Sequence, residues 1–537
     1  MIQFRLVCMG ILIFCRCTIG VAADVATTQP DYSSKILTPP APPTPRINGP
    51  RVYGQRPGRP FIYTIPATGD RPMTFAADGL PDGLKLDPQT GRISGSVALA
   101  GEFNVTLSAK NSAGSDEKKF KIVIGDKISL TPPMGWNSWN CWAWMVDQDK
   151  ILRSAKAMVS SGLINHGWSY INIDDTWQGK PDPQSLALQS NEKFPDIKSL
   201  FDQIHGMGLK AGIYSTPWRG SYAMFQGGSA DNAQRNWEMP PPDKRFLEPN
   251  PHHVIGQYHF ASNDAKQWAA WGMDYLKYDW NPNDIPSTKE MNDALLASGR
   301  DFIFSLSNSA PFENAPMLSQ LSNCWRTTGD IRDNWFSMST IGFSQSKWTS
   351  FAGPGHWNDT DMLVVGWVGW GEKLHSTYLT ADEQYTHISL WSLLSAPMLI
   401  GCDLEKLDPF TLNLLTNDEV LAIDQDPLGK QATCVSQQGG DVTISGTPPY
   451  GHPESHQLPR GQVWAKELED GTCAVGLFNL GDEPMTVTAN FSDLKLSGKQ
   501  VVRDLWRQEN IGAFADKYEA IVPPHGVVLV KMTPASK

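Results

Sequence analysis

The 537-residue chain contains little histidine and little cysteine, and neither residue is spaced for metal binding. It has 11 His and 8 Cys without a C-x-x-C pair, so no zinc site is indicated. Three cysteines precede residue 24, and the odd number that follows does not indicate a disulfide scaffold. The sequence leaves open whether Cys434 and Cys473 form a disulfide bridge. The sequence therefore predicts no metal site.

Positive charge is also scarce in this chain. The formal net charge is −11 and the pI is about 5.5, so nothing favours binding to nucleic acid or to an anionic membrane surface. After residue 21, no apolar stretch is long enough to cross a bilayer. We therefore expect no nucleic-acid partner and no membrane span, and the sequence leaves the oligomeric state open.

The N-terminus carries the most apolar run of the chain. Arg5 precedes an apolar stretch that ends in the small residues Val21, Ala22 and Ala23. This pattern predicts a signal peptide over residues 1–23, cleaved after Ala23, and hence a secreted or periplasmic protein. The next segment, residues 24–48, includes "LTPPAPPTP", which predicts an extended proline-rich linker.

Residues 49–126 show the pattern of an all-β domain. Short runs with apolar residues at every second position are separated by turn clusters such as "DGLPDG" and "PQTG". The stretch "GLPDGLKLDPQTGRISG" resembles the immunoglobulin-like (Ig-like) module appended to many exported bacterial enzymes. We expect an Ig-like β-sandwich here, acting as a spacer or as a glycan-contacting module.

From residue 131 to about 428, strand-like runs alternate with helical patterns. The predicted helices cover residues 149–161, 196–207, 262–272, 287–299, 312–321, 335–350, 380–395 and 409–424. Eight such units have the count and size of a (β/α)8 TIM barrel. The alternative is an open doubly wound sheet, but no glycine-rich dinucleotide fingerprint follows any strand. We therefore predict an α/β fold in which the barrel, residues 131–428, follows the Ig-like β-sandwich.

The last segment, residues 429–537, again favours strands. "VWAKELEDGTCAVGLFNLG" predicts a hairpin that turns at Asp470-Gly471. The C-terminal part is therefore predicted to be an antiparallel β-sandwich domain.

Polar side chains stand at the predicted carboxyl ends of the barrel strands, where barrel active sites lie. In chain order they are Trp136, Asp174, Asp175, Tyr214, Lys277, Asp279, Ser305, Ser307, Arg326, Asp330, Asp359 and Asp361. Any one aspartate could be a helix N-cap, but all of them at one rim are harder to explain in that way. The set has no histidine for a metal hydrolase, no G-x-S-x-G nucleophile elbow and no phosphate loop. It favours glycoside hydrolysis by two carboxylates.

The stretch "LKYDW" places Lys277 and Asp279 on the same face of one strand, since residues i and i+2 point to the same side. A nearby cation would lower the pKa of Asp279 and keep it ionised as a nucleophile. A plain ion pair between the two is the alternative. Asp330 follows a different strand, so it can approach the scissile oxygen from the other side.

Five motifs carry a resemblance to a known family: "TPPMGWNSWN", "NIDDTW", "LKYDW", "CWRTTGDI" and "GPGHWNDTDMLVVG". In this order they resemble the α-galactosidases and α-N-acetylgalactosaminidases of glycoside hydrolase family 27. The resemblance implies that Asp279 is the nucleophile and Asp330 the general acid/base of a retaining hydrolysis without a cofactor. It also implies that further residues line the sugar pocket: Trp136, Asp174, Asp175, Tyr214, Lys277, Arg326 and Asp361.

The sequence departs from the family pattern near the site. Thr176 and Asn281 stand where many members have cysteine, and the fifth strand motif, "FIFSLSNSAPF", is the least typical. Small residues, Ser307 and Ala310, align with the positions that contact the 2-position of the sugar. The expected substrate is a galactose-containing oligo- or polysaccharide. The alternatives are an α-N-acetylgalactosaminidase, a β-L-arabinopyranosidase, or a non-catalytic carbohydrate-binding surface protein.

Overall fold

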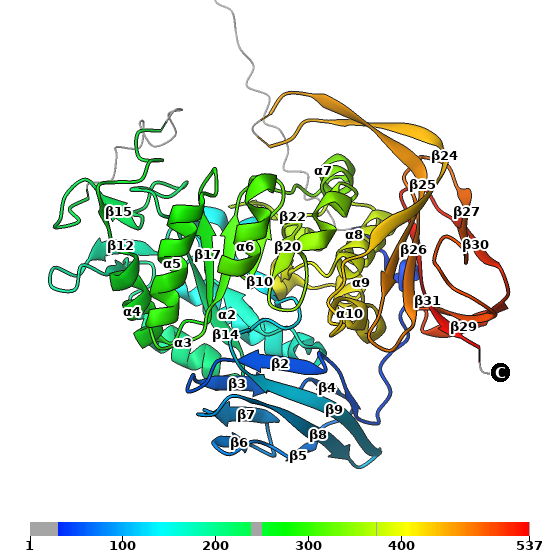
Figure 1. Ribbon diagram of the computed structural model, residues 1–537, viewed down its shortest axis with the longest axis horizontal. Coiled ribbons are helices and arrows are strands. Elements are labelled where there is room, and N and C mark those ends of the chain that lie inside the picture. Colours follow the sequence, from blue (N-terminus) through cyan, green and yellow to red (C-terminus); the bar gives the residue numbers. More distant parts are fainter. Residues whose placement is uncertain (1–29, 238–249, 372, 450, 536–537) are drawn as a thin grey trace, which may run out of the picture.

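The structure is a computed structural model, and the residues that it describes are 30–237, 250–371, 373–449 and 451–535. The predicted signal peptide lies outside the described residues. Figure 1 shows a β module at the N-terminal end of the chain, a central barrel of strands and helices, and a sheet domain at the C-terminal end. The predicted fold class is confirmed.

The barrel is an eight-stranded parallel sheet whose neighbours follow the order of the chain. Its strands are β10 (Met134–Asn137), β11 (Tyr170–Asn172), β14 (Lys210–Ser215), β17 (Tyr275–Asp279), β18 (Ile303–Ser307), β19 (Cys324–Arg326), β20 (Trp357–Asp359) and β23 (Met398–Ile400). The last strand pairs with the first, and a parallel bridge from Leu363 to Ile400 closes the ring. This closure excludes the open doubly wound sheet.

Helices follow the strands at the predicted places and cover the outside of the barrel. They are α2 (Gln148–Ser160), α3 (Ile197–Gly206), α4 (Ala261–Trp271), α5 (Ile285–Ala297), α6 (Ala315–Leu321), α7 (Trp335–Gly342), α8 (Ala381–Leu394), α9 (Pro409–Leu415) and α10 (Asp418–Asp424), with a short α1 (Trp139–Trp142). Their N-caps include Asp147, Asp196, Asp284, Asn334 and Thr380. The rim aspartates Asp174 and Asp359 are not among these caps, which leaves them available for chemistry.

The N-terminal module is a two-sheet β-sandwich. One sheet has the order β2-β9-β8-β5 and the other β3-β7-β6. Its strands are β1 (Arg46–Ile47), β2 (Val52–Gln55), β3 (Phe61–Thr64), β4 (Ala67–Thr68), β5 (Thr74–Asp78), β6 (Leu84–Leu86), β7 (Arg92–Gly95), β8 (Gly101–Asn111) and β9 (Gly114–Ile124). Alternate residues of β8 (Val105, Leu107 and Ala109) are buried between the sheets, as period-two alternation predicts.

The module packs against the end of the barrel opposite the carboxyl ends of the strands (Figure 1). Asp301, which precedes β18, accepts hydrogen bonds from the Gln55 side chain at 2.7 Å and from the Arg56 backbone and guanidinium at 2.8 and 2.9 Å. The Lys210 ammonium, at the start of β14, bonds to the Tyr53 hydroxyl. A cavity of about 110 Å³ remains between the two parts. The module is therefore attached to the barrel by specific polar contacts.

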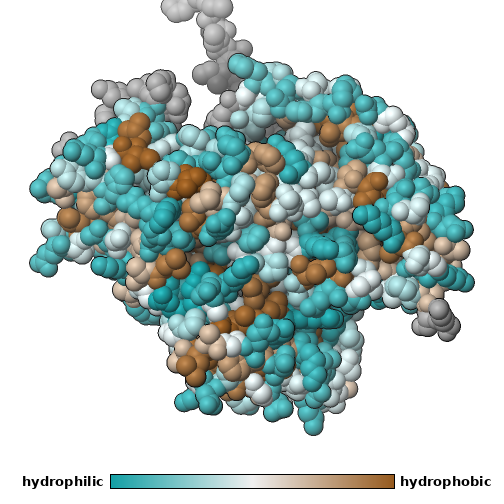
Figure 2. Space-filling view, viewed as in Figure 1, coloured by the Kyte–Doolittle hydropathy of each residue, from teal (hydrophilic) through white to brown (hydrophobic). Residues whose placement is uncertain are grey.

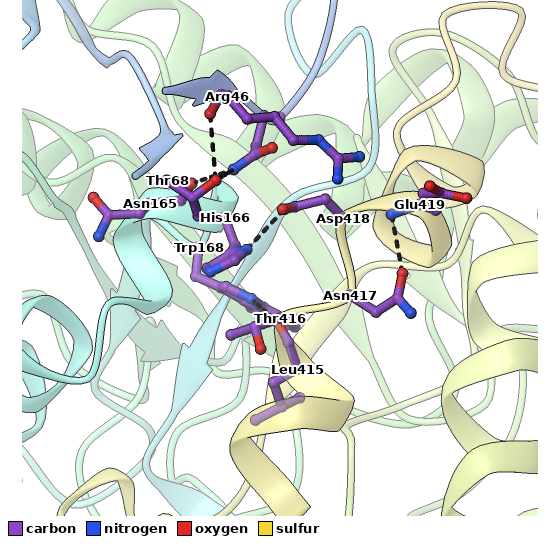
Figure 3. Close-up of polar contacts among 12 residues, drawn as sticks. Arg46, Thr68, Asn165, His166, Trp168, Leu415, Thr416, Asn417, Asp418 and Glu419 are labelled. Carbon is purple, nitrogen blue, oxygen red and sulfur yellow. Dashed lines mark hydrogen bonds and ion pairs between the residues drawn. The ribbon is translucent and has the colours of Figure 1, made fainter. Parts of the chain in front are cut away.

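A second junction joins the module, the segment after α2 and α10. The Asn48 amide donates to the backbone oxygen of Asn165 at 3.0 Å. Figure 3 shows His166 pointing toward Asp418, with 2.7 Å between the ring Nδ1 and the carboxylate. The Trp168 indole N–H donates to the Leu415 carbonyl at 2.8 Å in the same region. These contacts tie the first and last helical units of the barrel to the module.

Removing the Ig-like module should lower stability without removing the catalytic rim. A chain starting at residue 126 should keep its rate on a small aryl glycoside, because no rim residue belongs to the module. It should unfold at least about 5 °C lower, since Lys210 and Asp301 lose their partners. Thermal unfolding and kcat/KM measure the two effects.

A point variant of the full chain tests how much the contact between the module and the barrel contributes to stability. Asp301→Ala should reproduce part of the loss of thermal stability, whereas Asp293→Ala should not, because Asp293 forms only an exposed ion pair with Lys289. A folded truncated chain without activity would contradict this assignment and show that the module helps to build the site.

The C-terminal domain contains a six-stranded antiparallel sheet and a two-stranded one. Its strands are β24 (Thr433–Gly446), β25 (Glu454–Glu467), β26 (Cys473–Asn479), β27 (Met485–Asn490), β28 (Gln500–Asp504), β29 (Glu509–Phe514), β30 (Lys517–Val522) and β31 (Val527–Pro534). The predicted hairpin at Asp470-Gly471 is confirmed as the turn between β25 and β26, with Gly471 at a φ of 76°. The long β24–β25 hairpin reaches over α7 (Figure 1).

Part of the predicted proline-rich linker contacts the barrel. Residues 32–38 of the proline-rich segment pack on α8 and α9, where the Tyr385 hydroxyl donates to the Lys35 carbonyl at 2.8 Å.

In the described ranges, all five cysteines are free thiols and no helix is long and apolar enough to span a membrane. The face in Figure 2 is mostly hydrophilic, and its hydrophobic side chains form small separate groups.

Candidate active site

The register of the barrel strands places the predicted site residues at neighbouring positions. Tyr214 pairs with Lys277, and Lys277 pairs with Ser305 on the next strand. One step nearer the carboxyl ends, Asp279 pairs with Ser307. The barrel therefore brings residues that lie far apart in sequence to one rim.

Lys277 forms its ion pair with Asp174 rather than with Asp279. Its Nζ lies 2.8 Å from Asp174 Oδ2. Burial alone would lower the pKa of Lys277, but the charges of Asp174 and Asp279 hold it above the usual value, so the amine is cationic. The plain pair between Lys277 and Asp279 is thus replaced by a contact between the second and fourth strands.

Arg326 connects two carboxylates at the other side of the rim. Its guanidinium lies 3.2 Å from Asp330 Oδ1 and 2.9 Å from Asp361 Oδ1. Asp361 also accepts the backbone N–H of Ile331 at 2.8 Å, and its own φ is 73°, a left-handed conformation that is strained for this residue. The turn that carries Asp330 is therefore fixed from both ends, while its carboxylate remains 34% exposed.

Asp279 is buried and has two polar neighbours besides Lys277. The Asn308 side-chain amide donates to Asp279 Oδ1, and the buried Tyr214 side chain lies close to Asp279. Asn308 itself has a φ of 62°, a left-handed conformation that Asn tolerates better than most residues. These contacts orient the carboxylate at the end of β17.

The protonation of the two aspartates differs from the sequence-based expectation. Lys277 does lower the pKa of Asp279, but burial outweighs it and raises the pKa to about 7, with the charge of Asp330 adding to the rise. Burial also acts to raise the pKa of Asp330, but the positive charges of Arg326 and Lys277 hold it below its usual range. The free site therefore keeps a proton in the weakly acid range, and that proton belongs to the coupled pair.

Two more rim carboxyls share this environment. Burial raises the pKa of Asp359 to about 6, although Arg326 opposes the rise. Burial likewise raises the pKa of Asp361. The carboxylates at the rim outnumber the two cations, Lys277 and Arg326, so the site favours a bound proton or neutral hydroxyl donors.

Asp175 is engaged mainly by the chain itself. Its Oδ1 accepts from the Thr176 backbone at 2.7 Å and from Gln178 at 3.0 Å. Its Oδ2 accepts from the Ala223 backbone at 2.9 Å, and the Ser221 hydroxyl adds a further bond. Burial still raises the pKa of Asp175. These donors fasten the turn at residues 221–223 to the end of β11.

The remaining predicted residues also lie near the strand ends, and all three are buried. Trp136 is fully buried and its indole N–H donates to the Cys402 carbonyl at 2.7 Å. Ser307 and Ala310 are buried on the fifth strand and its loop, and the Ala310 N–H donates to the Arg326 carbonyl at 2.8 Å. A cavity of about 20 Å³ beneath the rim is lined by Asn137, Lys277, Ser305, Ser307 and Arg326 among others.

Sequence reasoning missed several side chains that shape this site. Asn308 follows Ser307 in the fifth strand motif, and its contact with Asp279 was not expected. Gln178 and Ser221 fix Asp175, although neither belongs to a strand-end motif. The one available signal was Asn308 itself, an amide directly after a buried strand.

The arrangement can perform acid–base and nucleophilic chemistry on a polyhydroxylated ring. Asp279 and Asp330 stand at one rim, each close to a cation, and no group of three or more His, Cys, Asp or Glu in the described residues is arranged to hold a metal. A barrel with two such carboxylates at its carboxyl-terminal rim defines the class: a (β/α)8 glycoside hydrolase.

Comparison with known proteins identifies the family. The family model described as "Alpha galactosidase A" matches residues 131–235 and 252–426. The model of the alpha galactosidase C-terminal beta sandwich domain matches residues 460–532, and an Ig domain model matches residues 44–125. The chain belongs to the α-galactosidase A family, glycoside hydrolase family 27, and is a glycoside hydrolase.

Individual relatives agree with this assignment. Alpha-galactosidase 2 of Arabidopsis thaliana is 36% identical over 439 residues, which cover 80% of this chain and 96% of that protein. A crystal structure of a Bacteroides fragilis protein is 30% identical, with a TM-score of 0.77 and coverage of 93% of this chain and 99% of that one. A β-L-arabinopyranosidase of Geobacillus stearothermophilus is 27% identical, with a TM-score of 0.62 and coverage of 76% and 97%.

Proposed function

We propose that the protein is an exported, retaining exo-glycosidase that hydrolyses terminal α-D-galactosyl residues of oligo- or polysaccharides. Family membership supports the reaction, and the α-galactosidases among the relatives support the sugar. Export rests on the signal-peptide pattern of residues 1–23. The observation that carries the mechanism is the placement of Asp279 and Asp330 on neighbouring parts of one rim, each tied to a different set of partners.

In the proposed mechanism, Asp279 attacks the anomeric carbon while Asp330 protonates the leaving oxygen. Asp279 must be ionised and Asp330 protonated at that moment, whereas the free site favours the proton on Asp279. The two forms are tautomers of the same singly protonated pair, so the active one is available over the same pH range. Asp330 then acts as base for the water that releases the sugar from Asp279.

The other rim residues would hold the ring. The Asp174–Lys277 pair presents an acceptor and a donor side by side, which suits neighbouring hydroxyls such as the axial 4-hydroxyl and its neighbour at the 3-position. The Arg326–Asp361 pair offers the same combination from the opposite side. We propose that Asp175, Trp136 and Tyr214 shape the wall of the pocket, and that Asn308 orients Asp279.

The group at the 2-position of the sugar distinguishes galactose, the leading substrate, from N-acetylgalactosamine, the first alternative. Ser307 and Ala310 are small and would leave room for an acetamido group, as in an α-N-acetylgalactosaminidase. Asn308 lies on the same loop and donates to Asp279, so the chain fills part of that side with a polar amide. An unsubstituted 2-hydroxyl fits such an amide, which favours galactose.

The 6-position of the sugar bears on the second alternative, a β-L-arabinopyranosidase. The family resemblance implies that Asp174 and Asp175 hold the 4-hydroxyl and the 6-hydroxyl of galactose. Donors of the chain already engage the Asp175 carboxylate, so a β-L-arabinopyranose ring, which has no C6 group, would not leave that carboxylate without hydrogen bonds. This observation keeps β-L-arabinopyranosidase activity as a second candidate.

A panel of nitrophenyl glycosides tests the substrate. We expect kcat/KM to be highest for the α-D-galactoside and at least about tenfold lower for its 2-acetamido analogue and for the β-L-arabinopyranoside, since each differs by one group worth roughly 1.4 kcal/mol. A clear preference for the acetamido sugar would overturn galactose as the substrate. Hydrolysis of none of the three, by a folded protein, would support the non-catalytic alternative.

A further inference from the structure

Aromatic side chains gather on two loops of the rim outside the residues assigned to the galactose pocket. The first loop follows β10 and carries Trp144, which is 55% exposed. The second, residues 365–371 and 373–380, follows β20 and carries Trp370 and Tyr378, the latter 68% exposed. We call Trp144, Trp370 and Tyr378, with Arg332, the aromatic rim. Trp370 is half-buried and packs against the core, whereas Trp144 and Tyr378 are largely exposed and therefore indicate an interaction surface.

The two loops are fixed against each other. The backbone N–H groups of Gly369 and Trp370 both donate to the Asn140 carbonyl, at 2.9 and 3.0 Å. A Cβ atom built on Gly371 would lie 3.5 Å from the Trp144 ring, so the ring already rests on this glycine. Trp370 has a φ of 49°, a strained conformation for an aromatic residue that these bonds hold in place. The aromatic rim is therefore preorganised.

The second loop carries a short hairpin, β21 (Trp367–Val368) with β22 (His375–Ser376), that lies beside α7 in Figure 1. The His375 ring stacks on Tyr378 with centroids 4.5 Å apart, which supports the exposed tyrosine from one side. The Tyr378 backbone N–H donates to Asp333 Oδ2 at 3.1 Å. The loop is thus anchored to the segment that follows Asp330.

The aromatic rim continues directly from the catalytic carboxylates. Arg332 stands two residues after Asp330, and its guanidinium lies 4.6 Å from the centroid of the Trp370 ring. The positive charge of Arg332 also helps to lower the pKa of Asp330. On the other loop, Lys193 Nζ joins the Trp144 carbonyl at 2.8 Å to the Thr176 hydroxyl at 2.7 Å, next to Asp175. The surface therefore borders the site on the side of the general acid.

We propose that the aromatic rim binds the sugar unit attached to the leaving oxygen, and thus makes the protein selective for α-galactosyl oligosaccharides over minimal galactosides. This inference rests on the proposed function. The general acid protonates the leaving oxygen, so a surface that begins two residues after Asp330 faces the leaving group. Aromatic rings contact the apolar C–H faces of a pyranose, and Arg332 supplies hydrogen-bond donors for its hydroxyls.

A neutral sugar suits this surface better than an anionic or an apolar partner. The one cation of the aromatic rim lies over the face of Trp370, and Asp330 and Asp333 stand close to it, so an anion would meet negative charge. The exposed rings are interrupted by the partly exposed polar side chains of Arg332 and His375, which an apolar protein partner would have to desolvate. Hydroxyl groups can satisfy both kinds of neighbour.

The test compares substrates with and without a sugar leaving group. α-D-Galactosyl fluoride has a single-atom leaving group that cannot reach the aromatic rim, whereas the α-1,6-linked disaccharide of galactose and glucose, and a galactosylated mannotetraose, can. In the full-length protein, Trp144→Ala and Tyr378→Ala should each lower kcat/KM on the oligosaccharides roughly tenfold, as expected for one aromatic contact, and should leave the fluoride rate nearly unchanged.

Conservative variants keep the test decisive. Trp144→Phe and Tyr378→Phe retain a ring and should recover most of the oligosaccharide activity, while Ile521→Ala, an exposed apolar residue on β30, should change neither substrate. Equal losses on fluoride and oligosaccharide would overturn the proposal, as would no loss on either. If the wild-type protein cleaved neither α-galactosyl substrate, the proposed function would fail instead of this inference.

Discussion

Asp279→Ala is expected to reduce glycosidase turnover by roughly 10⁴-fold or more, because no other group can form the covalent intermediate. Asn308 and Lys277 lie near the vacated position, but an amide and an ammonium cannot replace a carboxylate nucleophile. Steady-state kinetics on a nitrophenyl α-galactoside measure the loss. Near-normal turnover would remove Asp279 from this role.

Azide should restore part of the activity of this variant. The anion fits the space left by the carboxylate and attacks the anomeric carbon directly, which gives a β-galactosyl azide of inverted configuration. Asn308→Ala is the matched control, since it removes a neighbour of Asp279 and leaves the nucleophile. We expect this control to be slower than wild type, unaffected by azide, and still to form product with retention.

The Asp279→Ala variant should also remain folded, for a reason that the structure supplies. Burial raises the pKa of Asp279 to about 7, so the native state binds this proton more tightly than the unfolded state. The ionised carboxyl therefore costs stability, and this cost grows as the pH rises from about 4 to 7. The variant should lose this cost, so its Tm relative to wild type should increase between pH 4 and pH 8. A strong fall in Tm at pH 8 would contradict this account.

Asp330→Ala is expected to slow hydrolysis of substrates with poor leaving groups roughly 10²–10⁴-fold, the usual contribution of general acid catalysis. Dinitrophenyl galactosides need no protonation, so they should still form the intermediate on Asp279 and then stall, because the base for water is missing. A burst of dinitrophenol followed by a slow phase would show this. Equal losses on activated and unactivated substrates would argue against the acid/base role.

Azide separates the two aspartates. In Asp330→Ala it should attack the galactosyl–Asp279 intermediate from the side of the missing base, giving an α-galactosyl azide of retained configuration. The same reagent gives the β-anomer in the Asp279 variant. Identical azide products from both variants would mean that the two roles are assigned wrongly.

The pH profile follows from the shared proton. In the wild type, kcat/KM should fall above about pH 7, where the pair loses its one proton, and again in acid, where a second proton neutralises both carboxyls. In Asp330→Asn the acid limb is the titration of Asp279 alone, whose pKa is raised by burial, so this limb should move to higher pH than the second protonation of the wild-type pair. On an activated substrate its alkaline limb should disappear. An unchanged profile would contradict the coupling.

The site shows where sequence patterns suffice and where they do not. The spacing in "LKYDW" placed Lys277 and Asp279 on one face of a strand, and the register of β17 confirms it. The partner of Lys277 could not be read in the same way, since Asp174 lies 103 residues earlier and reaches it across β14. Only the assembly of β11, β14 and β17 side by side in the sheet brings these two side chains within 2.8 Å.

The protonation states likewise depend partly on the local sequence and partly on the tertiary structure. A cation two residues from Asp279 predicts a lowered pKa, and Lys277 does act in that direction. How deeply the carboxyl is buried depends on the surrounding strands and loops, and that burial reverses the sign. The contact of Asn308 with Asp279 likewise depends on a left-handed backbone that no local pattern specified.

The sequence by itself determined the elements and the chemistry of the rim. Apolar periodicity and polar N-caps such as Asp147 and Thr380 are local properties, so the eight strand–helix units and the aspartates at their ends could be recognised without coordinates. Tertiary structure decided which charges pair, which carboxyl holds the proton, and how the Ig-like module and the aromatic rim meet the barrel. These features depend on the distances between residues far apart in the chain and on how deeply their side chains are buried. Both quantities are set only when the chain folds.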